Sequence, residues 1–424
     1  MSSSLDIGTD APPLAADLQR WPALAEPKRA PLRAAAARLA IRRAVQRAGV
    51  HLTFPDGTSL GPTAGPLLEV RRPSAFFTRL GREGKIGFGE AYMAGDWDAP
   101  YLVDVLDAMA RRVDTLVPPK MQWIRRIYEP AHPTREDNDR DGARRNIARH
   151  YDLSNDLFAT FLDESMTYSS ALFAGGAEES LTEAQARKMD RLLDVTGVGP
   201  GSRVLEIGTG WGAMALRAAL RGARVTTVTL SEEQAALARK RVQQSGMSSA
   251  VDVRVEDYRD VTGQFDAVLS VEMIEAVGER WWPEYFRTLE KRLAPGGRIG
   301  LQTILMAHDR LQATKASWTW IHKYIFPGGL IPSAQAIRQT VSDYTNLQVV
   351  EQSNFGESYA ITLRRWRDLF DARSERIERL GFDRTFRRMW DFYLAYSEAG
   401  FRSGYLDVAQ LVLARGASSS RDAC

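Results

Sequence analysis

Glycines at alternate positions are the residues of this sequence best spaced for binding a ligand: Gly208, Gly210 and Gly212. They follow the apolar run 203–207, which predicts a strand, and precede the alanine- and leucine-rich run 213–220, which predicts a helix. Glycine lets the backbone turn tightly and lets a ligand approach closely. Since open α/β sheets bind ligands at the carboxyl ends of their strands, we expect a ligand-binding loop here.

The spacing of these glycines separates two kinds of cofactor site. A nicotinamide dinucleotide site favours Gly-x-Gly-x-x-Gly with an acid about 20 residues further on. Here every second residue is glycine, and an acid, Glu206, precedes the loop. That pattern is typical of class I methyltransferases, which bind S-adenosylmethionine. An oxidoreductase is the competing interpretation, and Leu230-Ser231, which stands where its acid would be, argues against it.

Three later segments agree with a methyltransferase site. Segment 229–234 follows the second predicted strand, where the ribose and the edge of the adenine ring would lie. Segment 256–258, Glu-Asp-Tyr, follows the third predicted strand and would contact adenine. Segment 295–297, Pro-Gly-Gly, precedes the fifth predicted strand, as is usual in methyltransferases.

The elements that must position these segments alternate between strands and helices. Strands are predicted at 203–207, 224–229, 251–255, 265–271 and 298–303, with helical patterns between them. Such alternation predicts an α/β fold with a doubly wound, mainly parallel sheet.

The N-terminal part of the chain has a different character. Segment 28–47 predicts an alanine-rich helix with seven basic residues and no acid: Lys28, Arg29, Arg33, Arg38, Arg42, Arg43 and Arg47. This helix either attracts anionic phospholipid headgroups or is simply a solvated face. Turn residues in 50–72 predict a small strand-containing unit, and a helix is expected at 101–113. The polar, charged run 131–142 predicts a linker between an accessory domain, 1–130, and a catalytic domain, 143–424.

Composition excludes several classes of function. The 424 residues are 44% hydrophobic and 26% charged, as in a globular protein, and no segment is apolar enough to cross a bilayer. One cysteine, Cys424, excludes an internal disulfide and disfavours a cysteine nucleophile, and the five histidines lack the spacing of a zinc site. A net charge of +3 is too small to indicate nucleic acid binding. The N-terminus lacks the pattern of a secretory signal, so we expect a cytoplasmic protein. Because the histidines lack the spacing of a zinc site, we also expect no bound metal.

Several motifs resemble those of the cyclopropane-fatty-acid synthase and mycolic-acid methyltransferase family. They extend from about Gly87 to Gly416 and include Gly87-Phe-Gly-Glu-Ala-Tyr92, His150-Tyr-Asp-Leu-Ser-Asn-Asp156, Met166-Thr-Tyr-Ser-Ser170, Val204 to Gly212, Ser270-Val-Glu-Met-Ile-Glu-Ala-Val-Gly278, Lys323-Tyr-Ile-Phe-Pro-Gly-Gly329, Tyr359 and Gly400-Phe-Arg-Ser-Gly404. The resemblance implies a class I, Rossmann-like methyltransferase fold with a smaller N-terminal α+β domain that associates with lipid.

Within this family the sequence is most similar to actinobacterial enzymes that methylate C10 of an oleoyl chain in the synthesis of tuberculostearic acid. The resemblance implies methyl transfer, through a carbocation, to the cis double bond of a phospholipid-bound chain at the inner membrane face. The product would be a 10-methylene chain, which a separate flavin- or NADPH-dependent reductase would saturate. A cyclopropane product is the alternative, and a lipid-binding protein without activity is another. The resemblance is also compatible with a homodimer.

The resemblance also assigns roles to residues of the cofactor site. Tyr168 and Ser169 would contact the methionine part of S-adenosylmethionine, and Leu230 and Gln234 would hold its ribose and adenine, with Tyr258 alongside. The complete set of candidate cofactor residues is Tyr168, Ser169, Glu206, Gly208, Gly210, Gly212, Thr229, Leu230, Gln234, Asp257 and Tyr258. Aromatic faces, with Tyr168 and Tyr359 as the best candidates, would stabilise the carbocation.

A final proton must leave the product, and the resemblance suggests where it goes. Cyclopropane synthases bind bicarbonate through a cysteine, a glutamate, a histidine, an isoleucine and a tyrosine. The matching residues here are Ser170, Glu275, Gln302, Ile304 and Tyr359, so the cysteine and the histidine are replaced. Serine and glutamine can still donate hydrogen bonds to bicarbonate, and the alternative is that Glu275 is itself the base. Ser397 stands in place of another family cysteine, which disfavours covalent catalysis.

Overall fold

The computed structural model describes residues 14–112, 138–140, 142–143, 145–146, 154–175 and 179–416. Most of the predicted linker, 131–142, and the start of the His150 motif lie outside these residues, as does Cys424. The chain divides into two compact units, which are described separately. The first comprises 1–132, 317–325 and 370–405, and the second comprises 133–316, 326–369 and 406–424.

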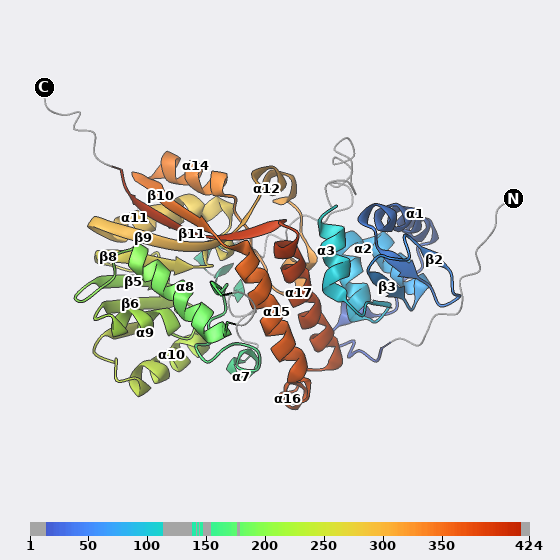
Figure 1. Cartoon of the computed structure of the whole chain (residues 1–424), viewed down its shortest axis with the longest axis horizontal. Helices are drawn as coiled ribbons and strands as arrows, with labels where there is room; N and C mark the ends of the chain where they lie inside the picture. The colour runs from blue at the N-terminus through green and yellow to red at the C-terminus, as the bar shows by residue number, and fades with distance from the viewer. Residues whose placement is uncertain are drawn as a thin grey trace, which may run out of the picture. The chain divides into compact units, whose positions relative to one another are not determined.

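The second unit contains a seven-stranded sheet with helices on both faces (Figure 1). Its elements are α7 (Asn155–Phe158), α8 (Leu181–Val195), β5 (Arg203–Ile207), α9 (Ala213–Leu220), β6 (Arg224–Thr229), α10 (Glu232–Gln244), β7 (Val251–Val255), β8 (Phe265–Val271), α11 (Trp282–Arg292), β9 (Leu293–Met306), α12 (His308–Thr314), α14 (Ala334–Tyr344), β10 (Leu347–Asn354), α15 (Gly356–Ala372) and β11 (Leu406–Arg415). Two short 3-10 helices, Ile274–Ala276 and Glu279–Trp281, follow β8.

The strand order is β10-β11-β9-β8-β5-β6-β7. Strands β5 to β9 pair in parallel, whereas β11 runs antiparallel to both β9 and β10. The first four predicted strands are confirmed. The prediction of a doubly wound, mainly parallel sheet is also confirmed. The fifth, β9, is longer than the predicted 298–303.

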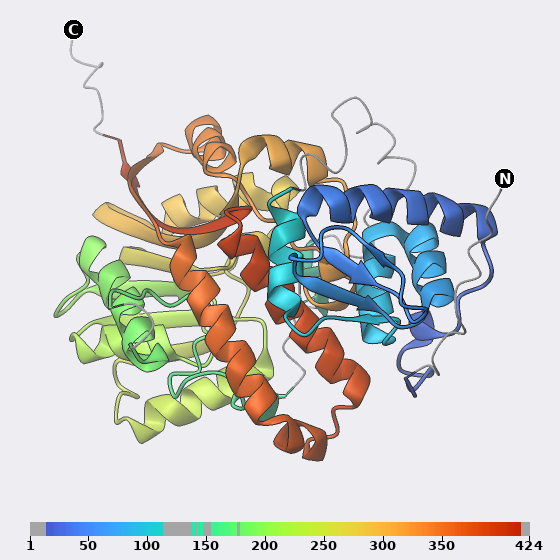
Figure 2. The ribbon, with the colours of Figure 1, turned by 45° about the vertical axis from the view of Figure 1, so that its right-hand side comes forward.

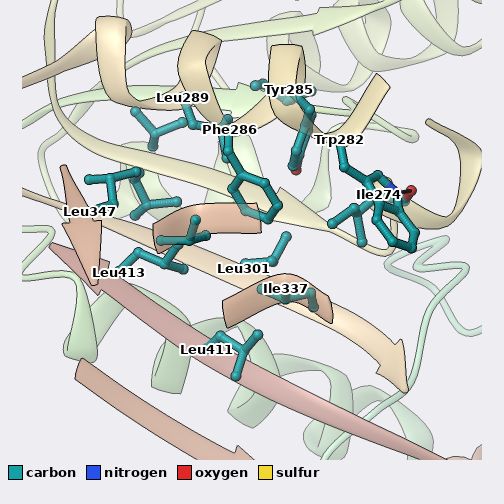
Figure 3. Close-up of a cluster of buried hydrophobic side chains, with 14 of the residues drawn as sticks. Ile274, Trp282, Tyr285, Phe286, Leu289, Leu301, Ile337, Leu347, Leu411 and Leu413 are labelled. Carbon is teal, nitrogen blue, oxygen red and sulfur yellow. Dashed lines mark hydrogen bonds between the residues drawn. The ribbon is translucent and has the colours of Figure 1, made fainter. Parts of the chain in front are cut away.

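Alternating side chains along the strands supply the two apolar layers of this unit. Leu205 and Ile207 of β5 face one layer, whereas Val204 of the same strand faces the other. Helices α11 and α14 cover the first layer, where Phe286 packs near Leu301 of β9 (Figure 3). Helices α8, α9 and α10 cover the second layer. This double covering buries β5 and β8, whose carboxyl ends carry the site residues.

The first unit contains a four-stranded sheet of order β2-β1-β3-β4 and several helices (Figures 1 and 2). Its elements are a 3-10 helix (Pro22–Leu24), α1 (Pro31–Ala48), β1 (His51–Thr53), β2 (Ser59–Leu60), β3 (Leu67–Val70), α2 (Pro73–Met93), β4 (Trp97–Asp98), α3 (Leu102–Ala110), α13 (Trp320–Tyr324), α16 (Ser374–Arg379) and α17 (Arg384–Arg402). The predicted basic helix, strand-containing unit and following helix correspond to α1, β1 to β3 and α3.

Segments 317–325 and 370–405 were expected in the catalytic domain, but their contacts group them with the N-terminal residues. Helix α17 packs against α2 and α3. The Tyr92 hydroxyl on α2 donates to Asp391 on α17 at 2.7 Å, and the guanidinium carbon of Arg388 lies 4.0 Å from the centre of the Tyr92 ring. These contacts join residues about 300 positions apart, so the first unit is not continuous in sequence.

Candidate active site

The glycine loop that follows β5 needs its glycines. Gly208, Gly210 and Gly212 have φ angles of 93°, 49° and 88°, in the left-handed region that other residues rarely adopt. A Cβ atom added to Gly208 would lie 2.7 Å from the Cγ atom of Met273. The loop therefore lies directly against the segment that follows β8.

Gly210 and Gly212 differ in what surrounds them. A Cβ atom on Gly212 would lie 3.3 Å from that of Ala238, so this glycine permits close packing on α10. Among the residues that the structure describes, none beyond its chain neighbours would lie within 4 Å of a Cβ atom on Gly210. The backbone at Gly210 is thus open to a close approach, which fits a site for S-adenosylmethionine.

Glu206 precedes the loop and points into the sheet rather than into solvent. Its side chain accepts a hydrogen bond from Thr227 of β6 at 2.6 Å, and the Thr227 hydroxyl lies 2.8 Å from that of Thr209 in the loop. Burial raises the pKa of Glu206 to about 8, against the effect of the Thr227 hydrogen bond. Burial thus favours the protonated form of Glu206, which links β5, β6 and the loop.

The end of β6 is fixed by hydrogen bonds at the start of α10. The Thr229 hydroxyl lies 3.1 Å from the Gln234 side-chain oxygen and accepts from the Ser231 backbone N–H. The Ser231 hydroxyl in turn caps α10 by accepting from the Gln234 N–H. Leu230 is half-buried between these polar residues. The structure thus brings Thr229, Leu230 and Gln234 together beside the glycine loop.

The end of β7 carries Asp257 and Tyr258, and both make internal contacts. Asp257 accepts two side-chain hydrogen bonds from Arg259, at 2.8 and 2.6 Å. Burial acts to raise the pKa of Asp257, but the Arg259 hydrogen bonds prevail and hold it below its ordinary value. The Tyr258 ring packs edge-on against Tyr285 at 5.6 Å. Because β5, β6 and β7 are parallel, these residues share one edge of the sheet with the loop.

Tyr168 belongs to a cluster of aromatic side chains. Its ring lies 5.1 Å from that of Phe158 and 5.2 Å from that of Trp366. The Trp366 ring also contacts Tyr359 edge-on at 6.2 Å, and Phe158 contacts Trp211 of the glycine loop at 5.0 Å. The two tyrosines expected to stabilise a cation therefore lie in one aromatic cluster that reaches the cofactor loop.

Ser170, Gln302 and Tyr359 meet as expected, but they converge on a residue that was not expected. The Glu272 carboxylate accepts hydrogen bonds from the Ser170 backbone N–H at 2.9 Å, from the Gln302 side-chain amide at 2.9 Å and from the Tyr359 hydroxyl at 2.7 Å. The Ser170 hydroxyl donates instead to the carbonyl oxygen of Ala171. Three of the expected anion-binding residues thus hold a carboxylate of the chain itself.

Glu275 lies three residues further on and is held by β9. Its Oε1 atom accepts from the Ile304 backbone N–H at 2.6 Å and from the Thr303 hydroxyl at 2.9 Å. Its Oε2 atom is buried and has no hydrogen-bond partner among the residues that the structure describes. Burial, reinforced by the charge of Glu272, raises the pKa of Glu275 to about 8. Burial and the charge of Glu272 thus both favour the neutral form of Glu275.

A second layer of polar residues holds this pocket. Gln410 of β11 donates to the Gln302 side-chain oxygen at 3.1 Å and to the Lys188 carbonyl oxygen at 3.0 Å. The Lys188 ammonium is buried and donates to the Ser169 hydroxyl at 2.7 Å. Burial lowers the pKa of Lys188 to about 8, against the attraction of Glu272. Lys188 thus supplies positive charge close to the Glu272 carboxylate.

Sequence analysis missed Glu272, Lys188 and Gln410. Glu272 stands in the motif Ser270-Val-Glu-Met-Ile-Glu275, directly after a buried strand, which is a detectable signal. Gln410 interrupts an apolar strand, and a lone amide in such a strand indicates a buried polar partner. Among the described residues there is no cluster of acids, histidines and cysteines that could hold a metal, and no helix that could span a membrane.

Comparison with known proteins identifies the family of this chain. The family described as mycolic acid cyclopropane synthetase matches residues 138–411. The chain belongs to this family. Tuberculostearic acid methyltransferase UfaA1 of Mycobacterium tuberculosis is 52% identical and covers 96% of this chain and 98% of its own length. Cyclopropane-fatty-acyl-phospholipid synthase of Escherichia coli is 33% identical over 85% of this chain and 91% of its own.

Solved structures of family members have the same fold. The cyclopropane synthase MmaA2 of Mycobacterium tuberculosis is 29% identical with a TM-score of 0.59, over 64% of this chain and 98% of its own. The synthase CmaA1, complexed with SAH and CTAB, gives the same identity and TM-score over 64% of this chain and 97% of its own. This family member is therefore an S-adenosylmethionine-dependent class I methyltransferase, as the glycine spacing predicted.

Proposed function

We propose that this enzyme transfers a methyl group from S-adenosylmethionine to the cis double bond of a phospholipid-bound oleoyl chain, giving a 10-methylene chain. The observation that carries the proposal is the pair of carboxylates, Glu272 and Glu275, on the segment that touches the glycine loop through Met273. Methylation of an alkene carbon ends with loss of a proton, so it needs a proton acceptor beside the methyl donor. Similarity to a tuberculostearic acid methyltransferase over 96% of the chain supports oleate as the substrate.

The cofactor residues surround one edge of the sheet. The glycine loop would cradle the methionine part of the cofactor with Tyr168 and Ser169, and Glu206 would hold the loop in place. Thr229, Leu230 and Gln234 would contact the ribose and adenine, with Asp257 and Tyr258 at the adenine edge. When bound, S-adenosylmethionine supplies an electrophilic methyl group on a sulfonium centre.

The reaction needs a base to accept one proton, but no oxidant, reductant or third substrate. The alkene electrons form the new bond to the methyl carbon at C10, the electrons of the broken bond stay on sulfur, and C9 becomes positive. A hydride moves from C10 to C9, the new methyl group loses a proton, and its C–H electrons close the methylene double bond. The faces of Tyr168 and Tyr359 would stabilise the cation, and their aromatic neighbours would exclude water.

An assay with oleoyl phosphatidylglycerol vesicles and methyl-deuterated S-adenosylmethionine tests this function. We expect product chains that keep two of the three methyl deuterium atoms, because one is lost as the final proton. Since the methylene and cyclopropane chains have the same mass, the product is identified by NMR. A cyclopropane product would establish the alternative activity, and the absence of labelled lipid would reject both.

Access to a phospholipid requires attachment at a membrane surface, which we assign to α1. Its buried side consists of Ala37, Ile41 and Val45. Leu32 and Leu39 are 86% and 53% exposed, among the exposed basic residues Arg33, Arg42, Arg43 and Arg47. Arg38 instead lies over the Phe77 ring at 5.0 Å. Exposed leucines flanked by arginines suit a surface of anionic phospholipids, because both apolar insertion and charge contribute.

Vesicle sedimentation tests this assignment. We expect stronger binding to vesicles with phosphatidylglycerol than to neutral vesicles, decreasing as salt is added. Reversal of charge at Arg33 and Arg43 should abolish that preference, whereas Arg298→Glu, on the second unit, should not. Equal binding to neutral and anionic vesicles at low salt would contradict an electrostatic role. Attached through α1, the enzyme would act at the cytoplasmic face of the membrane, and a flavin- or NADPH-dependent reductase would saturate its product.

A further inference from the structure

Glu272 has a backbone conformation that is unusual for its residue type. Its φ angle is 51°, in the left-handed region, and only Ser154 and Met166 share this feature among the described residues that are not glycine. Its own N–H donates to the Gln302 carbonyl oxygen at 2.7 Å, which holds the backbone at the end of β8. Such conformations persist where the surroundings enforce them and are concentrated at functional sites. Here the conformation accompanies a side chain that enters the pocket.

The pocket around the Glu272 carboxylate is built for an anion. Oε1 accepts from the Ser170 backbone N–H and the Gln302 amide, and Oε2 accepts from the Tyr359 hydroxyl. These donors come from three separate parts of the second unit, and Gln410 fixes the Gln302 amide by donating to its oxygen. Hydrogen bonds from three donors favour the charged form of a carboxylate.

The neighbouring ionisable groups determine how protons are distributed. Glu275 has the buried oxygen without a hydrogen-bond partner among the described residues, so it is well placed to hold a proton while Glu272 stays charged. Burial raises the pKa of Glu272 above its ordinary value, and Lys188 opposes this rise. The carboxylate is thus a stronger base than a carboxylate in water, which suits removal of a carbon-bound proton.

We propose that the Glu272 carboxylate is the built-in base of this methyltransferase and replaces the dissociable bicarbonate that the family resemblance suggests. The inference rests on the proposed function. The proton of the new methyl group moves to an oxygen of Glu272, which becomes a neutral carboxylic acid, while the C–H electrons form the methylene double bond. Release of that proton to solvent regenerates the base, so no other acceptor is consumed.

Two variants separate this role from a structural one. Glu272→Gln keeps the size and the hydrogen-bonding oxygen of the side chain but cannot accept a proton. Glu272→Gly removes the carboxylate, relieves the left-handed conformation and leaves room for a small anion among Ser170, Gln302 and Tyr359. Asp343→Asn, an exposed substitution of the same chemical kind on α14, is the matched control.

The first measurement does not depend on turnover. NMR with 13C-labelled bicarbonate, without cofactor or lipid, should detect saturable binding to Glu272→Gly and none to the unaltered protein or Glu272→Gln. Binding of bicarbonate to the unaltered protein with the affinity of the glycine variant would overturn the proposal. A folded Glu272→Gly protein that binds no bicarbonate would also overturn it, because the pocket would then not be an anion site.

The second measurement is methyl transfer in buffer freed of carbon dioxide. The unaltered protein and Asp343→Asn should be fully active, and added bicarbonate should not change their rates. The rate of methyl transfer by Glu272→Gln should be at least 100-fold lower at any bicarbonate concentration. Added bicarbonate should raise the rate of Glu272→Gly at least tenfold. Calorimetric titration with S-adenosylmethionine confirms that each variant keeps its cofactor site.

The outcomes distinguish this inference from the proposed function. If the unaltered protein transfers no methyl group to oleoyl phospholipid under any condition, the proposed function fails. If it transfers methyl groups only when bicarbonate is added, or if Glu272→Gln retains its rate within about twofold, the proposed function stands and Glu272 is not the base. Rescue of the glycine variant cannot come from a misfolded protein, so it supports the proposal directly.

Discussion

Substitution of Gly210 by alanine should separate cofactor binding from folding. Gly210 has a left-handed φ angle of 49°, and a Cβ atom there would meet no atom of the described residues within 4 Å, its chain neighbours aside. Alanine therefore adds conformational strain but no clash with the protein. Its methyl group would, however, project where the cofactor must approach the backbone. The substitution should therefore weaken the binding of S-adenosylmethionine strongly and lower the stability of the fold only slightly.

Both magnitudes can be estimated. A left-handed conformation costs an L residue about 1–2 kcal/mol. Each kcal/mol lowers the melting temperature of a domain of this size by about 2–4 °C. Gly210→Ala should therefore melt about 2–8 °C lower. Its dissociation constant for S-adenosylmethionine should rise at least tenfold, which corresponds to about 1.4 kcal/mol.

Gly246 provides the matched control. It lies after α10 with φ 71°, and a Cβ atom there would likewise have no neighbour within 4 Å in the described part of the chain, the adjoining residues aside. Gly246→Ala should show the same decrease in melting temperature with unchanged cofactor affinity. Calorimetric melting and isothermal titration measure the two quantities. Equal dissociation constants for Gly210→Ala and Gly246→Ala would refute the assignment of Gly210 to the cofactor site.

Three further predictions concern the buried ionisable groups. Thr227→Val removes the hydroxyl that donates to Glu206, so urea denaturation should show a free energy of unfolding lower by about 1–3 kcal/mol. An unchanged midpoint would show that this hydrogen bond does not stabilise the fold. The raised pKa of Glu275, about 8, means that the folded protein keeps a proton that the unfolded chain loses near pH 4.5. The free energy of unfolding should consequently fall as the pH rises from about 5 to 7.5, and that of Glu275→Gln should fall less steeply. Parallel profiles for the two proteins would show that Glu275 does not hold this proton. Lys188→Met should move the acid limb of the pH-rate profile to higher pH, because Lys188 lowers the pKa of Glu272; an unmoved limb would show that their charges do not interact.

The parallel core of the sheet was predictable because its strands carry strong local signals. Run 203–207 contains valine, leucine and isoleucine and is followed by glycine, and run 265–271 is mainly apolar. Strands β10 and β11 were not predicted. Strand β10 is largely polar and exposed at the sheet edge, so it has no clear alternation. Strand β11 is buried but lies far along the chain from its partner β9.

The candidate site was predictable where the backbone itself carries the signal. Three glycines at fixed spacing indicate a loop, since only glycine adopts its φ angles freely. The carboxylate at the centre of the pocket was missed for a physical reason. Residue types indicate that Ser170, Gln302 and Tyr359 can donate to an anion, but not which acid they surround. The choice between Glu272 and Glu275 depends on a left-handed backbone at one residue, which composition and spacing do not specify.

The first unit has a practical consequence for protein engineering. The chain passes between the two units after residues 132, 316, 325, 369 and 405. Neither unit is therefore a single segment that can be excised or grafted by one cut. An expression fragment that ends at residue 132 would lack α17, which packs against α2 and α3 and carries the buried Phe392, whose ring lies 5.3 Å from that of Tyr92. Inserted tags and fusion junctions belong at the ends of the chain, because a cut after residue 132 divides the first unit between the two fragments.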